Sequence, residues 1–136
     1  MTYSLDTNII IRLLRNEAAV NASFDKAVGR KEAVAISPFV DYEMRRGFYY
    51  CPAQAKEQLY LSLCKRYPVG EMTPAIWKRG ASIYAGLRRR GFTVKDADIL
   101  IAAFCIVNGY TLVTANTKDF ENIDGLRLIN WAEGQV

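Results

Sequence analysis

Four short apolar segments alternate with longer segments of helical pattern along this chain of 136 residues. The apolar segments cover residues 3–5, 33–37, 111–115 and 126–130. Short apolar strands buried on both faces are typical of parallel sheets, whose strands are connected by helical crossovers. We therefore predict an α/β fold, with a central parallel sheet flanked by helices as a three-layer sandwich and a single domain over residues 1–136.

Turn and capping residues set the predicted helix boundaries. The helical patterns cover approximately residues 9–15, 21–28, 38–50, 51–67, 73–90 and 94–109. Ser37 is expected to cap the third helix, with Pro38 at its first position, and Pro68 and Gly91 end the fourth and fifth helices. We expect the fourth and fifth helices to form a helical arm together.

The chain contains no histidine and three widely spaced cysteines, Cys51, Cys64 and Cys105. The lack of histidine excludes Ser-His and Cys-His nucleophiles and imidazole metal ligands. An odd number of cysteines without a C-x-x-C pair argues against a disulfide framework or a thiolate zinc site, so we expect buried core thiols. Any hydrolytic chemistry must depend on carboxylates.

Acidic side chains follow the predicted strands, at the edge of a parallel sheet where ligands bind. Asp6 directly follows the first strand, and Asp119 follows the third strand through Asn116. Glu43 lies on the helix that begins after the second strand. These three positions are candidates for one shared site.

Each of these positions also has a purely structural interpretation. Asp6, Thr7 or Asn8 can cap the helix that begins near residue 9. Asn116 with Asp119 can form a cap with its return partner, or an Asx-turn. In isolation the structural interpretation is favoured at each position, so a functional interpretation depends on their combination.

Helical geometry separates the acids that share a helix. Glu43 lies on a face with two apolar residues and Gly47, which would leave space for a metal or a backbone to approach. Asp41 lies about 200° around the same helix and has Arg45 four residues later, so we interpret it as part of a surface ion pair.

The last helix carries a second pair of acids. Asp98 shares its face with a narrow apolar stripe that can pack closely on the sheet, whereas Asp96 can cap the helix at its start. We therefore select Asp98 as the site candidate and interpret Asp96 as the cap.

Convergence of these four acids would have a large electrostatic cost. At about 4 Å, each pair of like charges costs roughly 4 kcal/mol at an effective dielectric constant of about 20, so the cluster should bind a cation or take up protons. Oxygen ligands without histidine or cysteine select Mg²⁺ or Mn²⁺. Such ions activate water and stabilise the leaving oxygen of a phosphodiester, which is nuclease chemistry.

Four motifs in this order resemble the acidic motifs of the PIN domain, and most closely those of VapC-type toxins of bacterial toxin–antitoxin systems. They are LDTNIII, ISPFVDYEMRRG, LRRRGFTVKDADILIAA and LVTANTKDFENIDGLRLINW, which together extend over nearly the whole chain. The resemblance assigns the metal-coordinating acids to Asp6, Glu43, Asp98 and Asp119, with supporting polar residues at Thr7, Asn8 and Asn116. It places Trp131 in the core.

The resemblance also implies an activity and partners. We expect a PIN-like sandwich with Mg²⁺- or Mn²⁺-dependent endoribonuclease activity, a homodimer, inhibition by a small VapB-like antitoxin and a higher-order complex with it. No apolar run approaches the roughly 20 residues of a membrane span, and the N-terminus carries an acid where a secretory signal is apolar. We therefore expect a cytoplasmic protein without a membrane partner.

A net charge of +4 fits a polyanionic partner, although cations at helix ends explain it equally well. The candidate contacts to RNA phosphates are Arg45, Arg46, Arg88, Arg89, Arg90 and Lys95. Tyr49, Tyr50 and Phe92 are candidate stacking surfaces for bases, with dimer or core contacts as the favoured alternative.

Two other functions are considered. A phosphoacceptor receiver domain expects adjacent acids after its first strand and a lysine after a late strand, and this chain has neither. A non-catalytic RNA-binding protein of the same fold is disfavoured by the complete set of acids. The sequence does not specify the RNA target.

Overall fold

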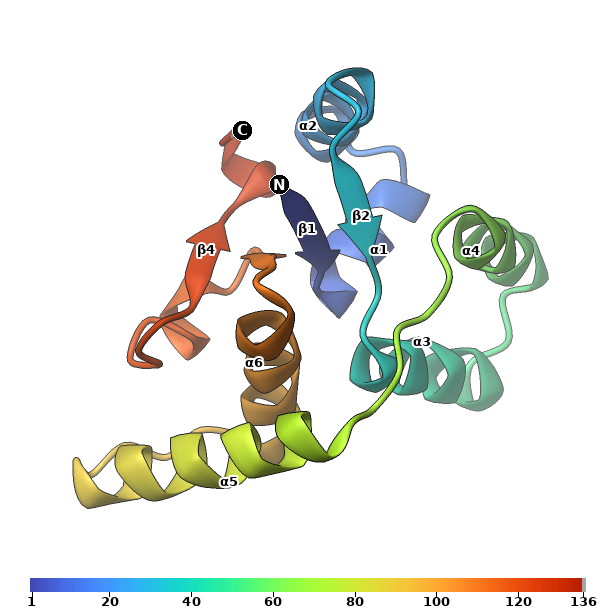
Figure 1. Ribbon diagram of the computed structural model, residues 1–136. Helices are drawn as coiled ribbons and strands as arrows, with labels where there is room; N and C mark the ends of the chain where they lie inside the picture. Colours follow the sequence, from blue (N-terminus) through green and yellow to red (C-terminus); the bar gives the residue numbers. More distant parts are fainter. Residues whose placement is uncertain (136) are drawn as a thin grey trace.

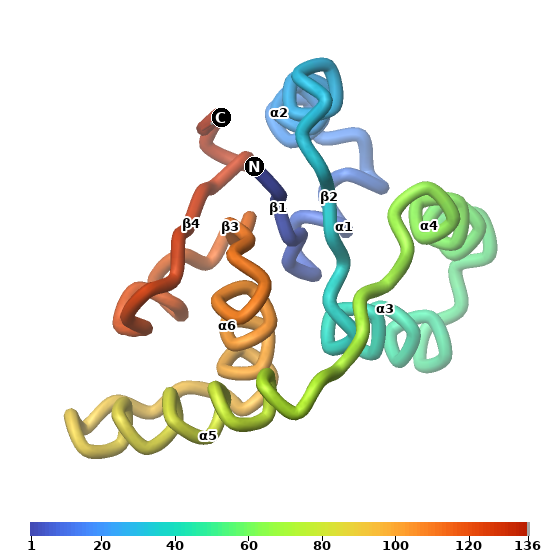
Figure 2. Tube along the Cα trace, viewed as in Figure 1, coloured from blue at the N-terminus to red at the C-terminus, as the bar shows by residue number. Residues whose placement is uncertain are grey.

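A four-stranded parallel sheet lies at the centre of the computed structural model, which describes residues 1–135. Its strands are β1 (Thr2–Leu5), β2 (Ala33–Ala35), β3 (Thr111–Val113) and β4 (Arg127–Ile129). Their order across the sheet is β2-β1-β3-β4, and every neighbouring pair is parallel (Figure 2). The predicted parallel sheet is confirmed.

Helices cover both faces of this sheet. They are α1 (Thr7–Leu14), α2 (Ala18–Gly29), α3 (Pro38–Tyr50), α4 (Gln54–Arg66), α5 (Pro74–Arg89) and α6 (Asp96–Asn108). The crossovers from β1 to β2 and from β2 to β3 run in opposite directions, so right-handed connections place α1 and α2 on one face and α6 on the other (Figure 1). Among residues 1–135, no helix is long and apolar enough to cross a membrane.

Local signals at the helix ends agree with the structure. Pro38 is the first residue of α3, and the Ser37 hydroxyl accepts a hydrogen bond of 3.1 Å from the Val40 amide. Gly109 ends α6 with φ at 73°, a left-handed conformation that favours glycine. These caps fix the points at which the chain leaves the sheet and returns to it.

The prediction that the fourth and fifth helices form an arm is wrong. In Figure 1, α4 lies beside α3 and α5 lies across the end of α6. The segment that joins them is held at the edge of the sheet, where Val69 forms a parallel bridge with Ile36 and the Gly70 amide donates to the Ile36 carbonyl. Because this bridge fixes the connection, each helix packs against a different part of the molecule.

The core lies on both sides of β1 and β3. Trp131 is fully buried and packs against Tyr3, with 5.4 Å between ring centroids, as predicted for a core residue. Cys105 is fully buried and Cys64 is half-buried, but Cys51 is exposed because it follows the last residue of α3. The expectation of three buried thiols is therefore wrong for Cys51.

Candidate active site

The carboxyl ends of β1 and β3 meet at the point where the strand order reverses. The chain leaves β1 toward β2 on one side and leaves β3 toward β4 on the other, which opens a crevice between the two strand ends. Asp6 follows β1, and its amide donates a hydrogen bond of 2.9 Å to the Val113 carbonyl. The sheet thus delivers Asp6 to the floor of this crevice.

The Asp6 carboxylate accepts three hydrogen bonds and is only 6% exposed. Its Oδ1 accepts from the Thr7 amide at 2.8 Å, and its Oδ2 accepts from the Thr114 hydroxyl at 2.9 Å and the Asn8 side-chain amide at 3.2 Å. Of the three residues that could cap the first helix, the structure selects Asp6 over Thr7 and Asn8, since α1 begins at Thr7. Asp6 combines the capping position with the crevice position.

Thr7 and Asn8 connect separate segments of the crevice. The Thr7 hydroxyl donates to Glu43 Oε1 at 2.9 Å, which joins α1 to α3. The Asn8 Oδ1 accepts from the Ala115 amide at 2.9 Å, which joins α1 to the segment after β3. Both side chains therefore hold the parts of the crevice together.

Sequence reasoning missed Thr114, which is fully buried between these segments. Besides donating to Asp6, its hydroxyl oxygen accepts a hydrogen bond of 3.0 Å from the Asn116 amide. The available signal was a threonine close to the carboxyl end of the apolar run 111–115, where the predicted strand ends. A buried hydroxyl at that place requires a partner.

The crevice widens into a hollow of about 420 Å³, here called the acidic hollow. Its lining includes all four predicted acids, the three predicted supporting polar residues and two of the predicted cations: Asp6, Glu43, Asp98, Asp119, Thr7, Asn8, Asn116, Arg46 and Lys95. These residues lie on α1, α3, α6 and η1 (Thr117–Asp119) or directly before one of these elements. The structure thus brings the four motifs to one place.

The acids influence each other's protonation. The pKa of Asp98 is raised to about 6, first by burial and then by the charges of Asp6, Asp119 and Glu43, against an opposing effect of Lys95. Burial also raises the pKa of Asp6, and its hydrogen bonds from Thr114 and Thr7 oppose that rise. The hollow therefore concentrates negative potential at Asp98.

The donor set fits a hard cation, but the side chains are not arranged around one. Among residues 1–135, no three acidic side chains stand close enough together to hold an ion as they are. Glu43 Oε2 instead lies 3.5 Å from Arg46 Nη2 in an ion pair. An all-oxygen set of carboxylates suits Mg²⁺ or Mn²⁺ once the side chains move inward.

The other two acids considered, Asp41 and Asp96, lie outside the hollow. Asp41 pairs with Arg45 at 2.9 Å as predicted, and its other oxygen accepts a hydrogen bond of 2.6 Å from the buried Tyr60 hydroxyl. The prediction that Asp96 caps α6 is wrong, because Asp96 is already the first helical residue and Lys95 holds the capping position without a side-chain hydrogen bond.

The remaining candidate RNA contacts lie outside the acidic hollow. These are Arg45, Arg88, Arg89 and Arg90, of which the last three lie at the end of α5. Tyr49 and Tyr50 are 86% and 93% exposed and Phe92 is 38% exposed, so none of the three is a core residue.

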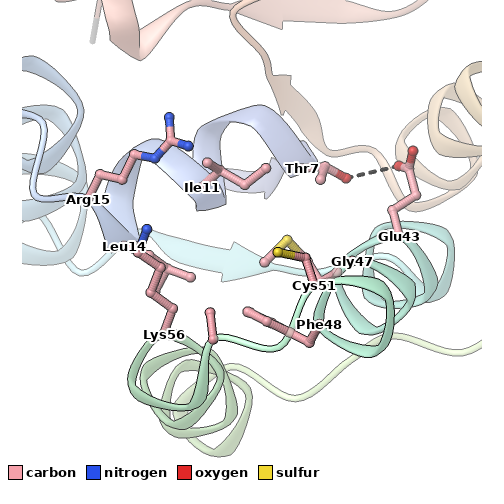
Figure 3. Close-up of a pocket in the computed structure, with 11 residues that line it drawn as sticks. Thr7, Ile11, Leu14, Arg15, Glu43, Gly47, Phe48, Cys51 and Lys56 are labelled. Carbon is pink, nitrogen blue, oxygen red and sulfur yellow. Dashed lines mark hydrogen bonds between the residues drawn. The ribbon is translucent and has the colours of Figure 1, made fainter.

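A second depression, here called the apolar groove, runs between α1, α3 and α4 and measures about 330 Å³ (Figure 3). Ile11, Phe48 and Cys51 line it, and Glu43 belongs both to this groove and to the acidic hollow. Gly47 faces the groove rather than the hollow, and a Cβ there would meet no atom within 4 Å. The space predicted beside Gly47 therefore exists, but it belongs to the apolar groove and not to the acidic hollow.

Comparison with known families agrees with this architecture. The family model of the PIN domain matches residues 3–126. The chain belongs to the PIN domain family. This PIN domain has the acidic crevice at the carboxyl ends of β1 and β3, where its four motifs meet.

Curated relatives extend over almost the whole PIN domain. It is 26% identical over 132 residues to Ribonuclease VapC2 of Rickettsia felis. This alignment covers 96% of this chain and 98% of that protein. It is 28% identical over 134 residues to the tRNA(fMet)-specific endonuclease VapC of Shigella flexneri, covering 97% and 99%. The likeness to VapC-type proteins stated from the motifs is confirmed.

Solved structures show the same likeness. The chain superposes with a TM-score of 0.86 and 26% identity on a chain of VapBC2 from Rickettsia felis bound to a DNA fragment from their promoter. The match covers 96% of this chain and 99% of the other. The predicted PIN-like sandwich is confirmed.

Proposed function

We propose that this PIN domain is a metal-dependent endoribonuclease of the VapC type, the toxin of a toxin–antitoxin pair. The observation that carries the proposal is the acidic hollow, in which four carboxylates from separate parts of the chain meet; burial and the charges of the other three raise the pKa of Asp98. A bound cation relieves the repulsion between such carboxylates, so cation binding lowers the free energy of the site. The names of the relatives, both ribonucleases or endonucleases, support RNA as substrate.

Asp6, Glu43 and Asp98 are proposed to hold Mg²⁺ or Mn²⁺, with Asp119 assisting a second ion or the attacking water. When bound, such an ion supplies an activated water and stabilises the charge that develops on the phosphodiester. The Thr7 hydroxyl holds Glu43 beside the hollow through a hydrogen bond of 2.9 Å. The Thr114 hydroxyl fixes the orientation of the Asp6 carboxylate. These contacts preorganise the oxygen ligands.

Arg46 is proposed to change partners during this process. In the structure it neutralises Glu43 and lines the hollow. When Glu43 turns toward a cation, the guanidinium is released beside the place where the substrate phosphate must lie. Arginine binds phosphate oxygens through two parallel hydrogen bonds, so the released side chain suits that task.

The apolar groove is proposed as the binding site of a VapB-like antitoxin. Its lining is mainly apolar, and it opens directly onto Glu43, so an occupant can also block the acidic hollow. Structures of relatives solved as VapBC assemblies support a small protein partner. We further propose that residues 1–136 act as one domain, form a homodimer in the cytoplasm, and join the antitoxin in a higher-order complex.

The activity is tested with purified protein, single-stranded RNA and Mn²⁺ or Mg²⁺. Wild-type protein is expected to cleave the RNA and to lose activity with EDTA, and Asp6→Asn and Asp98→Asn are expected to cleave at least a hundredfold more slowly. Asp124→Asn is the matched control, since Asp124 is exposed and outside the hollow. Full activity in both site variants would overturn the assignment.

The same assay separates catalysis from simple RNA binding. A non-catalytic RNA-binding protein would leave bound RNA intact after Mn²⁺ is added.

The partner is tested by co-expressing the protein of a neighbouring small open reading frame with wild-type toxin and with Cys51→Arg. Cys51 is exposed in the groove and outside the hollow, so this variant should stay active and resist neutralisation.

A further inference from the structure

A second cavity of about 240 Å³ lies directly beside the acidic hollow. The two share Lys95, Asp98 and Asp119, so the carboxylates form the wall between them. The far side of this cavity, here called the side cavity, is formed by Phe92, Lys118 and Asn122. A ligand long enough to pass Asp98 and Asp119 would therefore reach the side cavity.

The aromatic wall of the side cavity is held rigidly by its backbone. Gly91 adopts φ at 81° after the end of α5, and the Phe92 amide donates a hydrogen bond of 2.9 Å to the Leu87 carbonyl. This is a glycine-dependent helix ending in which the second residue beyond the helix is fixed. The position of Phe92 does not depend on a flexible loop.

The Arg90 side chain also holds Phe92 in place. Its guanidinium carbon lies 5.5 Å from the centroid of the Phe92 ring, in a cation–π contact. Its Nη2 donates a hydrogen bond of 2.7 Å to the Asn122 carbonyl, which joins the end of α5 to the segment after β3. Despite these contacts Phe92 remains 38% exposed and lines the side cavity, so part of its side chain is accessible to a ligand there.

The charges of the side cavity suit one nucleotide. Lys95 and Lys118 supply two ammonium groups, and both side chains are exposed. Phosphates are held by lysine and arginine, while bases of single-stranded RNA stack on aromatic rings. The cavity combines both features next to the proposed cleavage centre.

We propose that the side cavity binds the nucleotide adjacent to the scissile phosphate, with its base against Phe92 and its phosphate near Lys95 and Lys118. This inference rests on the proposed ribonuclease function and extends it to substrate positioning. It requires single-stranded RNA, because a base stacked on Phe92 must leave its own helix. Arg90 acts as a positioning residue that holds the ring.

Binding of a short, labelled single-stranded RNA is measured by fluorescence anisotropy in EDTA. Phe92→Leu keeps an apolar side chain but removes the stacking face, and is expected to weaken binding about tenfold. Lys118→Gln is expected to weaken it about fivefold and to reduce the slope of log affinity against log salt by about 0.7. Unchanged affinity in both variants would overturn the proposal.

Two matched controls test whether the effects are local. Tyr49→Leu removes a more exposed aromatic ring on α3, and Lys65→Gln removes an exposed lysine on α4. Both are expected to bind RNA within twofold of wild type. If Tyr49→Leu weakens binding and Phe92→Leu does not, the stacking surface lies on α3 and the proposal is wrong.

A substrate variant separates stacking from a structural effect. After the cut is mapped, an abasic nucleotide is placed on either side of it in turn. On one side of the cut, the abasic nucleotide should raise KM as much as Phe92→Leu does. Combining that abasic substrate with the Phe92→Leu variant should raise KM no further than either change alone. Additive losses on both sides would show that Phe92 does not contact that base.

Cleavage kinetics with Mn²⁺ distinguish this proposal from the function on which it rests. If wild-type protein neither binds nor cuts RNA, the proposed ribonuclease function fails. If wild-type protein cuts RNA and the Phe92 and Lys118 variants have its KM, only the side-cavity proposal fails. Where binding in EDTA is too weak to measure, the ratio of KM values decides.

Discussion

The Thr114 hydroxyl donates a hydrogen bond of 2.9 Å to Oδ2 of Asp6, across a sequence separation of 108 residues. Both side chains are buried, so the bond lies in a medium of low dielectric constant. It joins the ends of β1 and β3 at the floor of the acidic hollow. The orientation of Asp6 therefore depends on a residue near the other end of the chain.

Thr114→Val is expected to lower the free energy of unfolding by about 2 kcal/mol, because a buried carboxylate loses a donor and the Asn116 amide loses its acceptor. Urea unfolding measures this change. Thr111→Val, on the strand β3 that directly precedes Thr114, is the matched control, since the buried Thr111 hydroxyl has no hydrogen-bond partner. Its stability should stay the same or rise, and equal losses in both variants would contradict the role of Thr114.

Arg46→Gln is expected to bind Mn²⁺ about fivefold more tightly than wild type, because Glu43 no longer has a competing cation. Isothermal titration calorimetry without RNA measures the affinity. The adjacent Arg45→Gln removes a cation that pairs with Asp41 and does not line the hollow, so its affinity should match wild type. Weaker Mn²⁺ binding by Arg46→Gln would show that Arg46 does not compete for Glu43.

Asp98→Asn is expected to stabilise the metal-free protein at pH 7.5. The pKa of Asp98 is raised from about 3.8 to about 6 in the fold, so the folded state disfavours its charge. The loss of stability caused by the charged Asp98 is absent below about pH 4. It develops as the pH rises and is complete above the folded pKa of about 6. Because Asp98 is half-exposed, we expect about 1 kcal/mol, or a rise in Tm of about 3 °C.

Thermal unfolding in EDTA at pH 4 and pH 7.5 measures this difference, which should vanish at the lower pH. Added Mn²⁺ should raise the Tm of wild type and have little effect on the variant. A variant that is less stable than wild type at pH 7.5 would contradict the conclusion that the fold disfavours the charged form of Asp98.

Tyr60→Phe is expected to lower the free energy of unfolding by about 2 kcal/mol, because it removes a buried hydrogen bond of 2.6 Å to the Asp41 carboxylate. RNA cleavage at 25 °C should be unchanged, since neither residue lines the acidic hollow. Tyr67→Phe removes an exposed contact with Arg66 and should change stability by less than about 0.5 kcal/mol. Differential scanning calorimetry compares the two variants.

Local sequence signals predict much of this fold because they act over a few residues. The apolar strands, the Ser37 cap and the Gly109 ending all depend on neighbours within one or two turns. At the N-terminus, Asp6, Thr7 and Asn8 are all good capping residues, so composition alone does not decide where α1 begins. The tertiary bond from Thr114 favours Asp6 as the cap.

Features that depend on distant contacts were not predicted. The bridge between Ile36 and Val69 separates α4 from α5, and no periodicity within either helix signals it. The bond from Tyr60 to Asp41 likewise depends on how α4 packs against α3. The acids themselves were identified by type and position, whereas their partners required the fold.

The separation of Asp6 from Thr114 also bears on how the protein is made. During synthesis the N-terminal strand leaves the ribosome long before β3, and β4 follows last. Until residues 111–119 have emerged, Asp6 lacks its donor and Asp119 does not yet exist in the chain. A nascent chain therefore carries no assembled acidic hollow until residues 111–119 have left the ribosome and paired with the N-terminal segment.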